Sequence, residues 1–282
     1  MKFHFGLIGY PLGHSLSPKI HTAALQACGF QGGYSLFPIH PDDRDGLKDL
    51  LARVRSGELH GLNVTIPHKQ NVIELMDELT PAAQTIGAVN TIYLREGKLI
   101  GDNTDAAGFL ADLKKFMAES PSPILGERLG VREKSAIVLG AGGSARAVVY
   151  ALLNEGWEVM IAARRIEQAH QLADSFTNYQ LHITTFDHQP LTFDLIVNAT
   201  PLGMTPNTET SPLPDELSLP PNAFVYDLAY NPRETKLIKT ARAQGLTAAT
   251  GLGMLIEQAA LSFEIWTGHI PPRDILYASV VE

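Results

Sequence analysis

Residues 135–145 read SAIVLGAGGSA, and this stretch decides the fold of the second half of the chain. The apolar run 135–139 predicts a buried strand, and the glycines that follow it predict a tight turn. A helix is expected over 147–155, and the run WEVMIA at 157–162 predicts a second strand. This strand–helix–strand unit is typical of an α/β domain with a parallel sheet.

The turn has the spacing Gly140-x-Gly142-x-x-Ala145 between a strand and a helix. Gly140 permits the sharp turn, Gly142 lets the backbone approach a pyrophosphate, and Ala145 allows close helix–strand packing. The N-terminus of the helix offers backbone N–H groups to phosphates. A glycine-rich turn without a ligand is the alternative, but the strand–turn–helix context favours a dinucleotide cofactor.

The end of the second strand indicates which dinucleotide is bound. An NAD site has an acidic residue there for the ribose hydroxyls, whereas residues 162–165 read AARR. The guanidinium groups of Arg164 and Arg165 suit a 2′-phosphate, although either could also be a solvated surface residue. We therefore predict NADP(H) rather than NAD, with Arg164 the stronger candidate.

Length and composition set the broad class. The chain has 282 residues, 45% hydrophobic and 18% charged, which is ordinary globular composition and a length typical of two domains. In the first half, the pattern predicts strands at 3–8, 34–39 and 61–66, and helices at 42–55 and 71–78. Strands that alternate with helices again indicate an α/β domain.

The expected fold is thus α/β, with an N-terminal α/β substrate domain and a Rossmann-type NADP-binding domain. We expect the first domain over residues 1–105 and the second over 106–250. Further strands are predicted at 181–185, 195–198 and 223–227.

Charge and cysteine content exclude several classes of partner. The formal net charge of −8 argues against nucleic acid and anionic membranes. Cys28 is the only cysteine, so the chain forms no internal disulfide, which suits a reducing cytoplasm. No signal peptide or membrane span is expected. The ten histidines show no metal-ligand spacing, so we predict no metal.

Four polar patches interrupt the apolar pattern of the first half: HSLSP at 14–18, NVTIPHK at 63–69, GAVNT at 87–91 and GDNTD at 101–105. Two serines before a helix suit a carboxylate ligand, although Ser17 is also the expected N-cap of that helix. Each patch alone could be a cap or a turn.

Together with GAGGSARA, NATPLGM, DLAYNP and GLGMLIEQA, these patches resemble the shikimate dehydrogenase family. The resemblance runs over residues 6–270 and rests on several ordered motifs. It implies reduction of 3-dehydroshikimate to shikimate with NADPH, a step of aromatic amino-acid (chorismate) biosynthesis.

The resemblance also implies residue roles. The catalytic pair would be Lys69 and Asp105. The substrate-binding residues would be Ser15, Ser17, Thr65, Asn90, Asp105, Tyr230 and Gln258. From the role of Gln258 and the glycine at Gly251, we expect the helices of residues 251–282 to return to the first domain and pack on it. The cofactor-binding residues would be Gly140, Ala141, Gly142, Gly143, Ser144, Arg164, Arg165, Asn198, Ala199, Thr200, Leu228, Gly251 and Met254.

One segment departs from the family. Its cofactor patch usually reads Asn-Arg-Thr with a further Arg three residues on, whereas this chain has Ala163, Arg164, Arg165 and then Gln168. Arg165 could replace the missing guanidinium, so the strength of the NADP preference is open. Two roles for Lys69 also stay open, which are transfer of the proton and stabilisation of charge alone.

Two rival functions remain beside this one. The first is an NAD-dependent quinate/shikimate dehydrogenase, and the missing acidic residue after the second strand counts against it. The second is a non-catalytic sensor that binds NADP, and the presence of both Lys69 and Asp105 counts against that. The sequence is compatible with a monomer or a homodimer.

Overall fold

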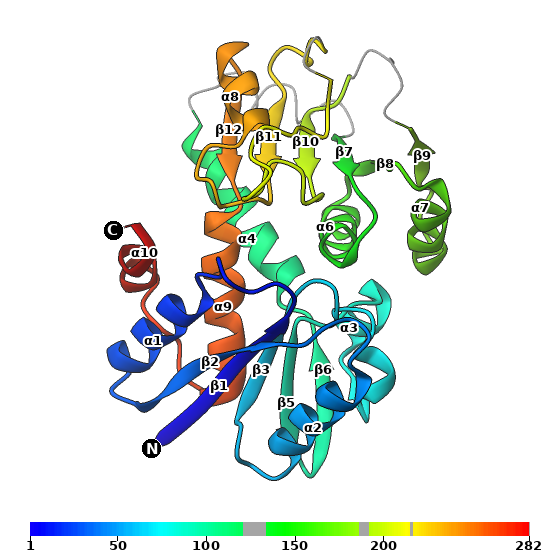
Figure 1. Ribbon diagram of the computed structural model, residues 1–282. Helices are drawn as coiled ribbons and strands as arrows, with labels where there is room; N and C mark the ends of the chain where they lie inside the picture. The colour runs from blue at the N-terminus through cyan, green and yellow to red at the C-terminus, as the bar shows by residue number, and fades with distance from the viewer. Residues whose placement is uncertain (121–133, 186–191, 215–216, 282) are drawn as a thin grey trace. The chain divides into compact units, whose positions relative to one another are not determined.

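The computed structural model describes residues 1–120, 134–185, 192–214 and 217–281. The chain divides into two compact units (Figure 1). The first comprises Met1–Gly108 and Leu255–Glu282, and the second comprises Phe109–Met254. The chain passes from one unit to the other within two helices, α4 (Asp105–Glu119) and α9 (Leu252–Thr267).

The first unit contains a mixed six-stranded sheet with the order β2-β1-β3-β5-β6-β4. Strands β2, β1 and β3 are parallel, β5 is antiparallel to both β3 and β6, and β4 is parallel to β6. The strands are β1 (Lys2–Gly9), β2 (Gln31–Pro38), β3 (Gly61–Val64), β4 (Glu78–Leu79), β5 (Thr91–Arg95) and β6 (Lys98–Asp102). Its other helices are α1 (Ser17–Ala27), α2 (Arg44–Arg55), η1 (Ile73–Leu75), α3 (Pro81–Ile86) and α10 (Arg273–Val281).

The side chains of β1 and β3 alternate between the two faces of this sheet, and each face packs against a different helix. Phe5 contacts the rings of Phe263 and Trp266 on α9. Ile8 and Leu62 belong instead to the core cluster that contains the apolar residues of α2. Because successive strand residues point to opposite faces, one face of the sheet packs on α9 and the other on α2. The C-terminal helices α9 (from Leu255) and α10 thus complete the first unit, α10 packing beside α1.

The second unit contains a parallel six-stranded sheet with the order β12-β11-β10-β7-β8-β9. Its strands are β7 (Ser135–Leu139), β8 (Glu158–Ala162), β9 (His182–Thr184), β10 (Leu195–Asn198), β11 (Phe224–Asp227) and β12 (Thr247–Thr250). Its helices include α6 (Gly143–Asn154), α7 (Ile166–Ala173), η2 (Asp174–Phe176) and α8 (Lys236–Ala243). The order of the strands reverses between β10 and β7, which is the switch point of a doubly wound Rossmann sheet.

Most elements agree with the sequence-based expectation, and three do not. The expected helix over 71–78 is wrong, because that segment forms the short η1 and then β4. Strand β12 was not foreseen, because Thr247-Ala-Ala-Thr250 has no apolar run. Ser17 is the first residue of α1 rather than its N-cap, which is Leu16.

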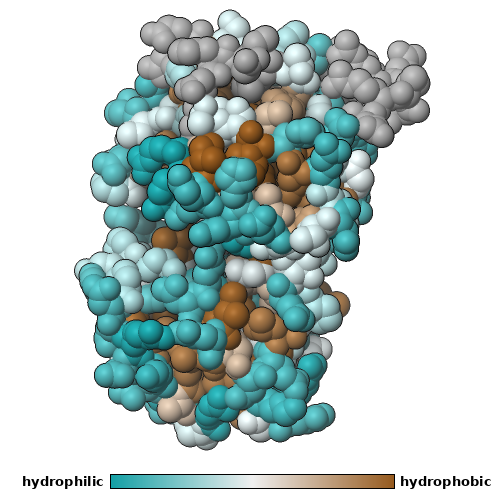
Figure 2. All heavy atoms as spheres, turned by 90° about the vertical axis from the view of Figure 1, so that its right-hand side faces the viewer, coloured by the Kyte–Doolittle hydropathy of each residue, from teal (hydrophilic) through white to brown (hydrophobic). Residues whose placement is uncertain are grey.

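The surface is mainly polar on the face shown in Figure 2, with apolar residues exposed in small groups. No helix of the described residues is both long enough and apolar enough to cross a bilayer.

The histidine His21 lies fully buried in α1. Its ring stacks on Tyr34, with 4.4 Å between centroids, and neither ring nitrogen has a hydrogen-bond partner among the described residues. Desolvation by burial lowers the pKa of His21 to about 3, and Asn63 offsets only part of this effect. His21 is therefore neutral in the fold but takes up a proton near its ordinary pKa when the chain unfolds.

We expect this histidine to make the fold sensitive to acid. Its pKa is lower in the folded state, so the unfolded state binds more protons and stability falls as the pH falls below about 6.5. Between neutral pH and about pH 5, His21→Phe should lose about 2 kcal/mol less stability than the unsubstituted chain. Urea unfolding of both proteins at the two pH values measures this, and equal losses would contradict it.

Candidate functional site

The carboxyl ends of β1 and β3 bring two of the polar patches together. The amide of Thr65 donates to the carbonyl of Ile8 at 2.8 Å, and that of Tyr10 donates to Ile66 at 3.0 Å. The loop after β1 carries Ser15, whose hydroxyl accepts from the Ser17 amide at 3.2 Å. The serines and Thr65 therefore lie on loops at one edge of the sheet, where parallel strands place ligand-binding residues.

Lys69 and Asp105 form a buried ion pair between these loops and the start of α4. The Lys69 Nζ donates to the Asp105 Oδ2, and the two residues are only 9% and 4% exposed. The carbonyl of Lys69 accepts from the Val89 amide at 2.7 Å, which ties its loop to the GAVNT patch. Removing one partner of such a pair leaves an uncompensated buried charge, so each residue needs the other.

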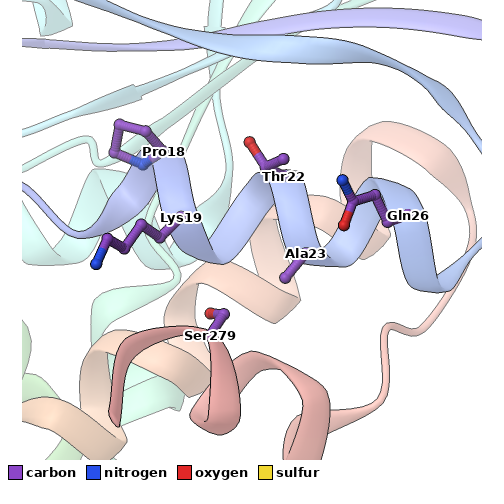
Figure 3. A pocket seen from close by; sticks show the side chains of 6 residues that line it. All are labelled: Pro18, Lys19, Thr22, Ala23, Gln26 and Ser279. Atoms are coloured by element: carbon purple, nitrogen blue, oxygen red, sulfur yellow. The ribbon is translucent and has the colours of Figure 1, made fainter. Parts of the chain in front are cut away.

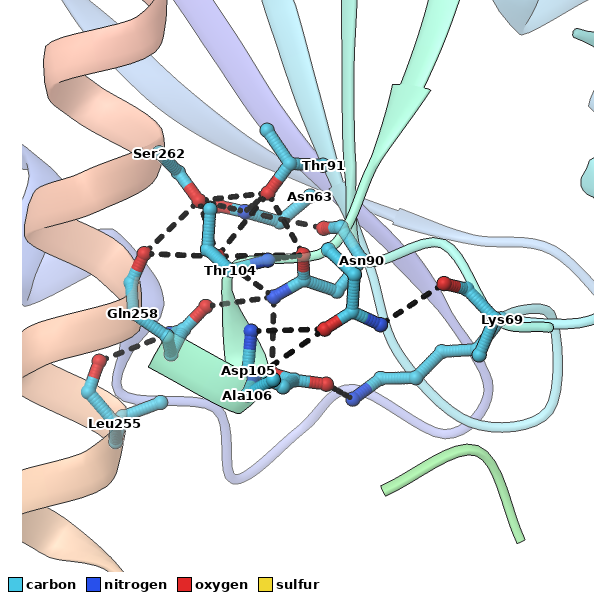
Figure 4. Close-up of polar contacts among 12 residues, drawn as sticks. Asn63, Lys69, Asn90, Thr91, Thr104, Asp105, Ala106, Leu255, Gln258 and Ser262 are labelled. Carbon is cyan, nitrogen blue, oxygen red and sulfur yellow. Dashed lines mark hydrogen bonds and ion pairs between the residues drawn. The ribbon is translucent and has the colours of Figure 1, made fainter. Parts of the chain in front are cut away.

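Asn90 connects this pair to α9 (Figure 4). Its Nδ2 donates to Asp105 Oδ1 at 2.9 Å and to Gln258 Oε1 at 3.2 Å. The Nε2 of Gln258 donates to the carbonyl of Leu255 at 2.9 Å. Four of the predicted residues, Lys69, Asp105, Asn90 and Gln258, thus form one hydrogen-bonded group.

Helices α4 and α9 approach very closely beside this group. A Cβ atom on Gly108 would lie 2.7 Å from the backbone nitrogen of Gln258 and 2.8 Å from its Cβ. Glycine at position 108 therefore lets the start of α4, with Asp105, lie against the turn of α9 that carries Gln258.

In the second unit, the glycine turn follows β7 and leads directly into α6. Gly140 has φ +114, and its missing Cβ would meet Thr200 and Ala199 at 3.1–3.3 Å. Gly142 is the N-cap of α6 with no side-chain capping bond, and a Cβ there would meet no atom within 4 Å. The first turn of α6 thus faces open space at Gly142, which is what a bound pyrophosphate needs.

Asn198 and Asp227 are the last residues of the neighbouring strands β10 and β11. The Asn198 Nδ2 donates to Asp227 Oδ1 at 2.8 Å, and its Oδ1 accepts from the amide and hydroxyl of Thr200. Burial raises the pKa of Asp227 to about 6, although bonds from Thr235, Ala229 and Asn198 oppose the rise. Asp227 was not among the predicted residues, although it directly precedes Leu228 in the DLAYNP motif.

The remaining cofactor candidates lie at or near strand ends of the second unit. Arg164 and Arg165 follow β8 and are exposed. Gly251 follows β12, and a Cβ there would lie 2.2 Å from the carbonyl oxygen of Leu228. Met254 is 7% exposed. Tyr230, a predicted substrate residue, belongs to this second unit, and burial raises its pKa.

Two further features bear on metal and ligand binding. No group of three or more His, Cys, Asp or Glu side chains in the described ranges suits a metal ion. A shallow hollow on the first unit lies along α1 and α10 (Figure 3). It is lined by Pro18, Lys19, Thr22, Ala23, Gln26 and Ser279, of which Lys19 alone is charged. It contains none of the predicted site residues.

Four buried polar residues behind Asn90 were not among the predicted residues, and these are Asn63, Thr91, Thr104 and Ser262. The first three lie within the polar patches, which was the available signal. Ser262 lies four residues after Gln258, the spacing that places two side chains on one face of a helix.

Three family models match the chain, and together they extend from residue 7 to residue 280. The shikimate dehydrogenase substrate binding domain matches residues 7–92. The shikimate / quinate 5-dehydrogenase model matches residues 124–237. The shikimate 5'-dehydrogenase C-terminal domain matches residues 251–280.

Relatives agree over nearly the whole length. A shikimate dehydrogenase (NADP(+)) of Methanopyrus kandleri is 39% identical, over 98% of this chain and 94% of its own. The Thermus thermophilus shikimate 5-dehydrogenase, solved with NADP(H) and shikimate, is 37% identical with a TM-score of 0.84, covering 98% of each chain. The Listeria monocytogenes enzyme, solved with shikimate and NAD, is 30% identical with a TM-score of 0.83, over 98% of this chain and 96% of its own. These similarities show that the chain belongs to the shikimate dehydrogenase family.

Proposed function

We propose that this chain catalyses the reversible, NADPH-dependent reduction of 3-dehydroshikimate to shikimate. The observation that carries the proposal is the buried Lys69–Asp105 pair, hydrogen-bonded through Asn90 to Gln258. A sensor that only binds NADP has no need of a buried cation beside a carboxylate and two amides. The single cysteine, Cys28, supports a cytoplasmic location.

Substrate binding is assigned to seven polar residues. Ser15 and Ser17, on the loop that leads into α1, would hold the carboxylate of the substrate. The hydroxyls and ring would be held by Thr65, Asn90, Asp105, Tyr230 and Gln258. Asn90 and Gln258 offer amide groups, which can donate and accept, and this suits the hydroxyls of shikimate.

The cofactor is assigned to the second unit. Gly140 to Ser144 would receive the pyrophosphate at the start of α6, and Arg164 with Arg165 would receive the 2′-phosphate. Asn198 to Thr200 would line the same site, with Leu228, Gly251 and Met254 beside the nicotinamide. When bound, NADPH supplies the hydride for the carbonyl carbon.

Lys69 performs the protein's part of the reaction. The Lys69 ammonium would stabilise the negative charge that the carbonyl oxygen gains during reduction. It can also give the oxygen a proton, and in the reverse direction take one from the hydroxyl. Asp105 accepts a hydrogen bond from Lys69 and holds the ammonium in place, while Asn90 orients the carboxylate through its other oxygen.

Lys69→Ala tests the catalytic assignment. We expect kcat with shikimate and NADP⁺ to fall at least about 100-fold, because the developing charge loses its cation. Binding of shikimate should change much less, because the other polar groups remain. Initial rates followed by cofactor absorbance measure turnover, and calorimetry measures binding.

Lys98→Ala is the matched control, because Lys98 is an exposed lysine of the same unit. It should keep normal kinetics. If Lys69→Ala raised KM at unchanged kcat, Lys69 would be a binding residue only. Failure of the unsubstituted chain to turn over shikimate with either cofactor, while it still bound NADP⁺, would favour the sensor.

Arg164→Ala tests the cofactor assignment. We expect KM for NADP⁺ to rise about 10-fold, because one charge-assisted hydrogen bond to the 2′-phosphate is lost. KM for NAD⁺ should stay nearly constant, because NAD⁺ has no phosphate there. Arg165→Ala measured in parallel shows how the two guanidiniums share the task. An unsubstituted chain that preferred NAD⁺ would overturn this assignment and leave the roles of Lys69 and Asp105 intact.

A further inference from the structure

A second polar layer lies directly behind Asn90, on the side away from Lys69 (Figure 4). It consists of Asn63, Thr91, Thr104 and Ser262, and we refer to it as the hydroxyl layer. These residues are between 0% and 5% exposed, so each polar atom depends on a partner in the protein.

The pleat of the sheet explains why this layer exists. Asn63 on β3 and Thr91 on β5 are direct partners in antiparallel register. Their neighbours Leu62 and Ile92, also paired, belong to the core on the α2 side. Asn63 and Thr91 consequently point to the opposite face, where α9 presents Ser262.

Ser262 contacts each of the other three residues of the layer. Its Oγ accepts from Asn63 Nδ2 at 3.0 Å and lies 2.7 Å from Thr91 Oγ1. It also lies 3.1 Å from Thr104 Oγ1, and it can donate to the carbonyl of Gln258 at 3.0 Å. One hydroxyl on α9 therefore connects β3, β5 and the loop that precedes α4.

These contacts form a continuous series that ends at the ion pair. Tyr34 Oη donates to Asn63 Oδ1 at 2.9 Å, and Asn63 donates to Ser262. When Ser262 directs its one hydrogen to Thr91 instead of to the carbonyl of Gln258, the Thr91 hydroxyl donates to Asn90 Oδ1 at 2.9 Å. Asn90 Nδ2 in turn donates to Asp105 Oδ1.

The direction of this series is fixed at Asn90. Its Oδ1 accepts from the backbone amide of Thr104 at 2.8 Å, and a backbone amide can only donate. Its Nδ2 faces Asp105, and an ionised carboxylate can only accept. The amide of Asn90 is thus held in one orientation. Because the amides of Asn63 and Asn90 separate the hydroxyls, the series orients groups and does not carry a proton.

We propose that Ser262 is a positioning residue for substrate binding, acting through Thr91 on the amide of Asn90. The proposal rests on the function proposed above, in which Asn90 and Gln258 hold the substrate hydroxyls. Without the Ser262 hydroxyl, Thr91 and Asn63 each lose a partner. The Thr91 hydroxyl that donates to Asn90 Oδ1 is then less firmly placed, while the Thr104 amide and hydroxyl and Asp105 still fix the Asn90 amide.

Ser262→Ala is the first test. KM for shikimate should rise about 10-fold, which is the effect expected from the loss of one hydrogen bond. The value of kcat should change by less than about 3-fold. KM for NADP⁺ should not change, because the cofactor residues belong to the second unit. Ser262→Thr, which keeps a hydroxyl, should restore most of the loss. Ser279→Ala is the matched control, because that hydroxyl donates to the carbonyl of Leu276 within its own helix α10.

A double-mutant cycle with Thr91→Val tests whether Ser262 acts on Asn90 through Thr91. If Ser262 acts through Thr91, the double variant should raise KM no more than the larger single effect, because both changes break the same series. Additive effects would overturn the route. Unchanged KM in Ser262→Ala, or a loss confined to thermal stability or to kcat, would overturn the positioning role itself.

A readout without substrate separates this proposal from the proposed function. The side-chain amide signals of Asn90 in a nitrogen-15 NMR spectrum, identified by their absence in Asn90→Ala, should shift and lose protection from exchange in Ser262→Ala. Unchanged signals would overturn the positioning role, whatever the enzyme turns over. An unsubstituted chain that does not use shikimate would overturn only the function.

Discussion

The ion pair of Lys69 and Asp105 is the constraint on which the first unit depends. Both charges are nearly inaccessible to water, and a buried charge is tolerated only when it is paired and hydrogen-bonded. Asp105 meets this need through Lys69 on one oxygen and Asn90 on the other. Asn90 in turn needs Thr104, Thr91 and Gln258. The polar interior of the first unit is therefore a hydrogen-bond network that satisfies the Asp105 carboxylate and then each residue bound to it.

In both units the proposed site residues lie at or near the carboxyl ends of parallel strands. In the first, the loops after β1 and β3 carry the serines, Thr65 and Lys69, while α9 closes one face of the sheet. In the second, the ends of β7 and β10 lie beside the switch point, where the glycine turn meets Ala199 and Thr200. The order of the strands thus brings together residues that are far apart in sequence. The glycines and alanines at these strand ends leave room for a ligand.

Features with a local cause could be predicted from the sequence. The strand at 135–139 and its glycine turn are one example, because an apolar run and φ +114 at Gly140 have signals within a few residues. Strand β12 was missed, because its pairing with β11 rather than its own residues makes it a strand. Ser262 could not be assigned for a related reason. It meets Asn63 across 199 positions, and only the packed sheet and helix bring the two together.

The contact between Gly108 and Gln258 has a consequence for how this protein can evolve. Position 108 has no neighbouring space for even a methyl group, since the obstacle includes helix backbone that cannot rotate away. Alanine, the mildest replacement, would force α4 from α9 and carry Asp105 away from the helix that bears Gln258. A lineage that keeps the contact between α4 and α9 therefore keeps glycine at residue 108.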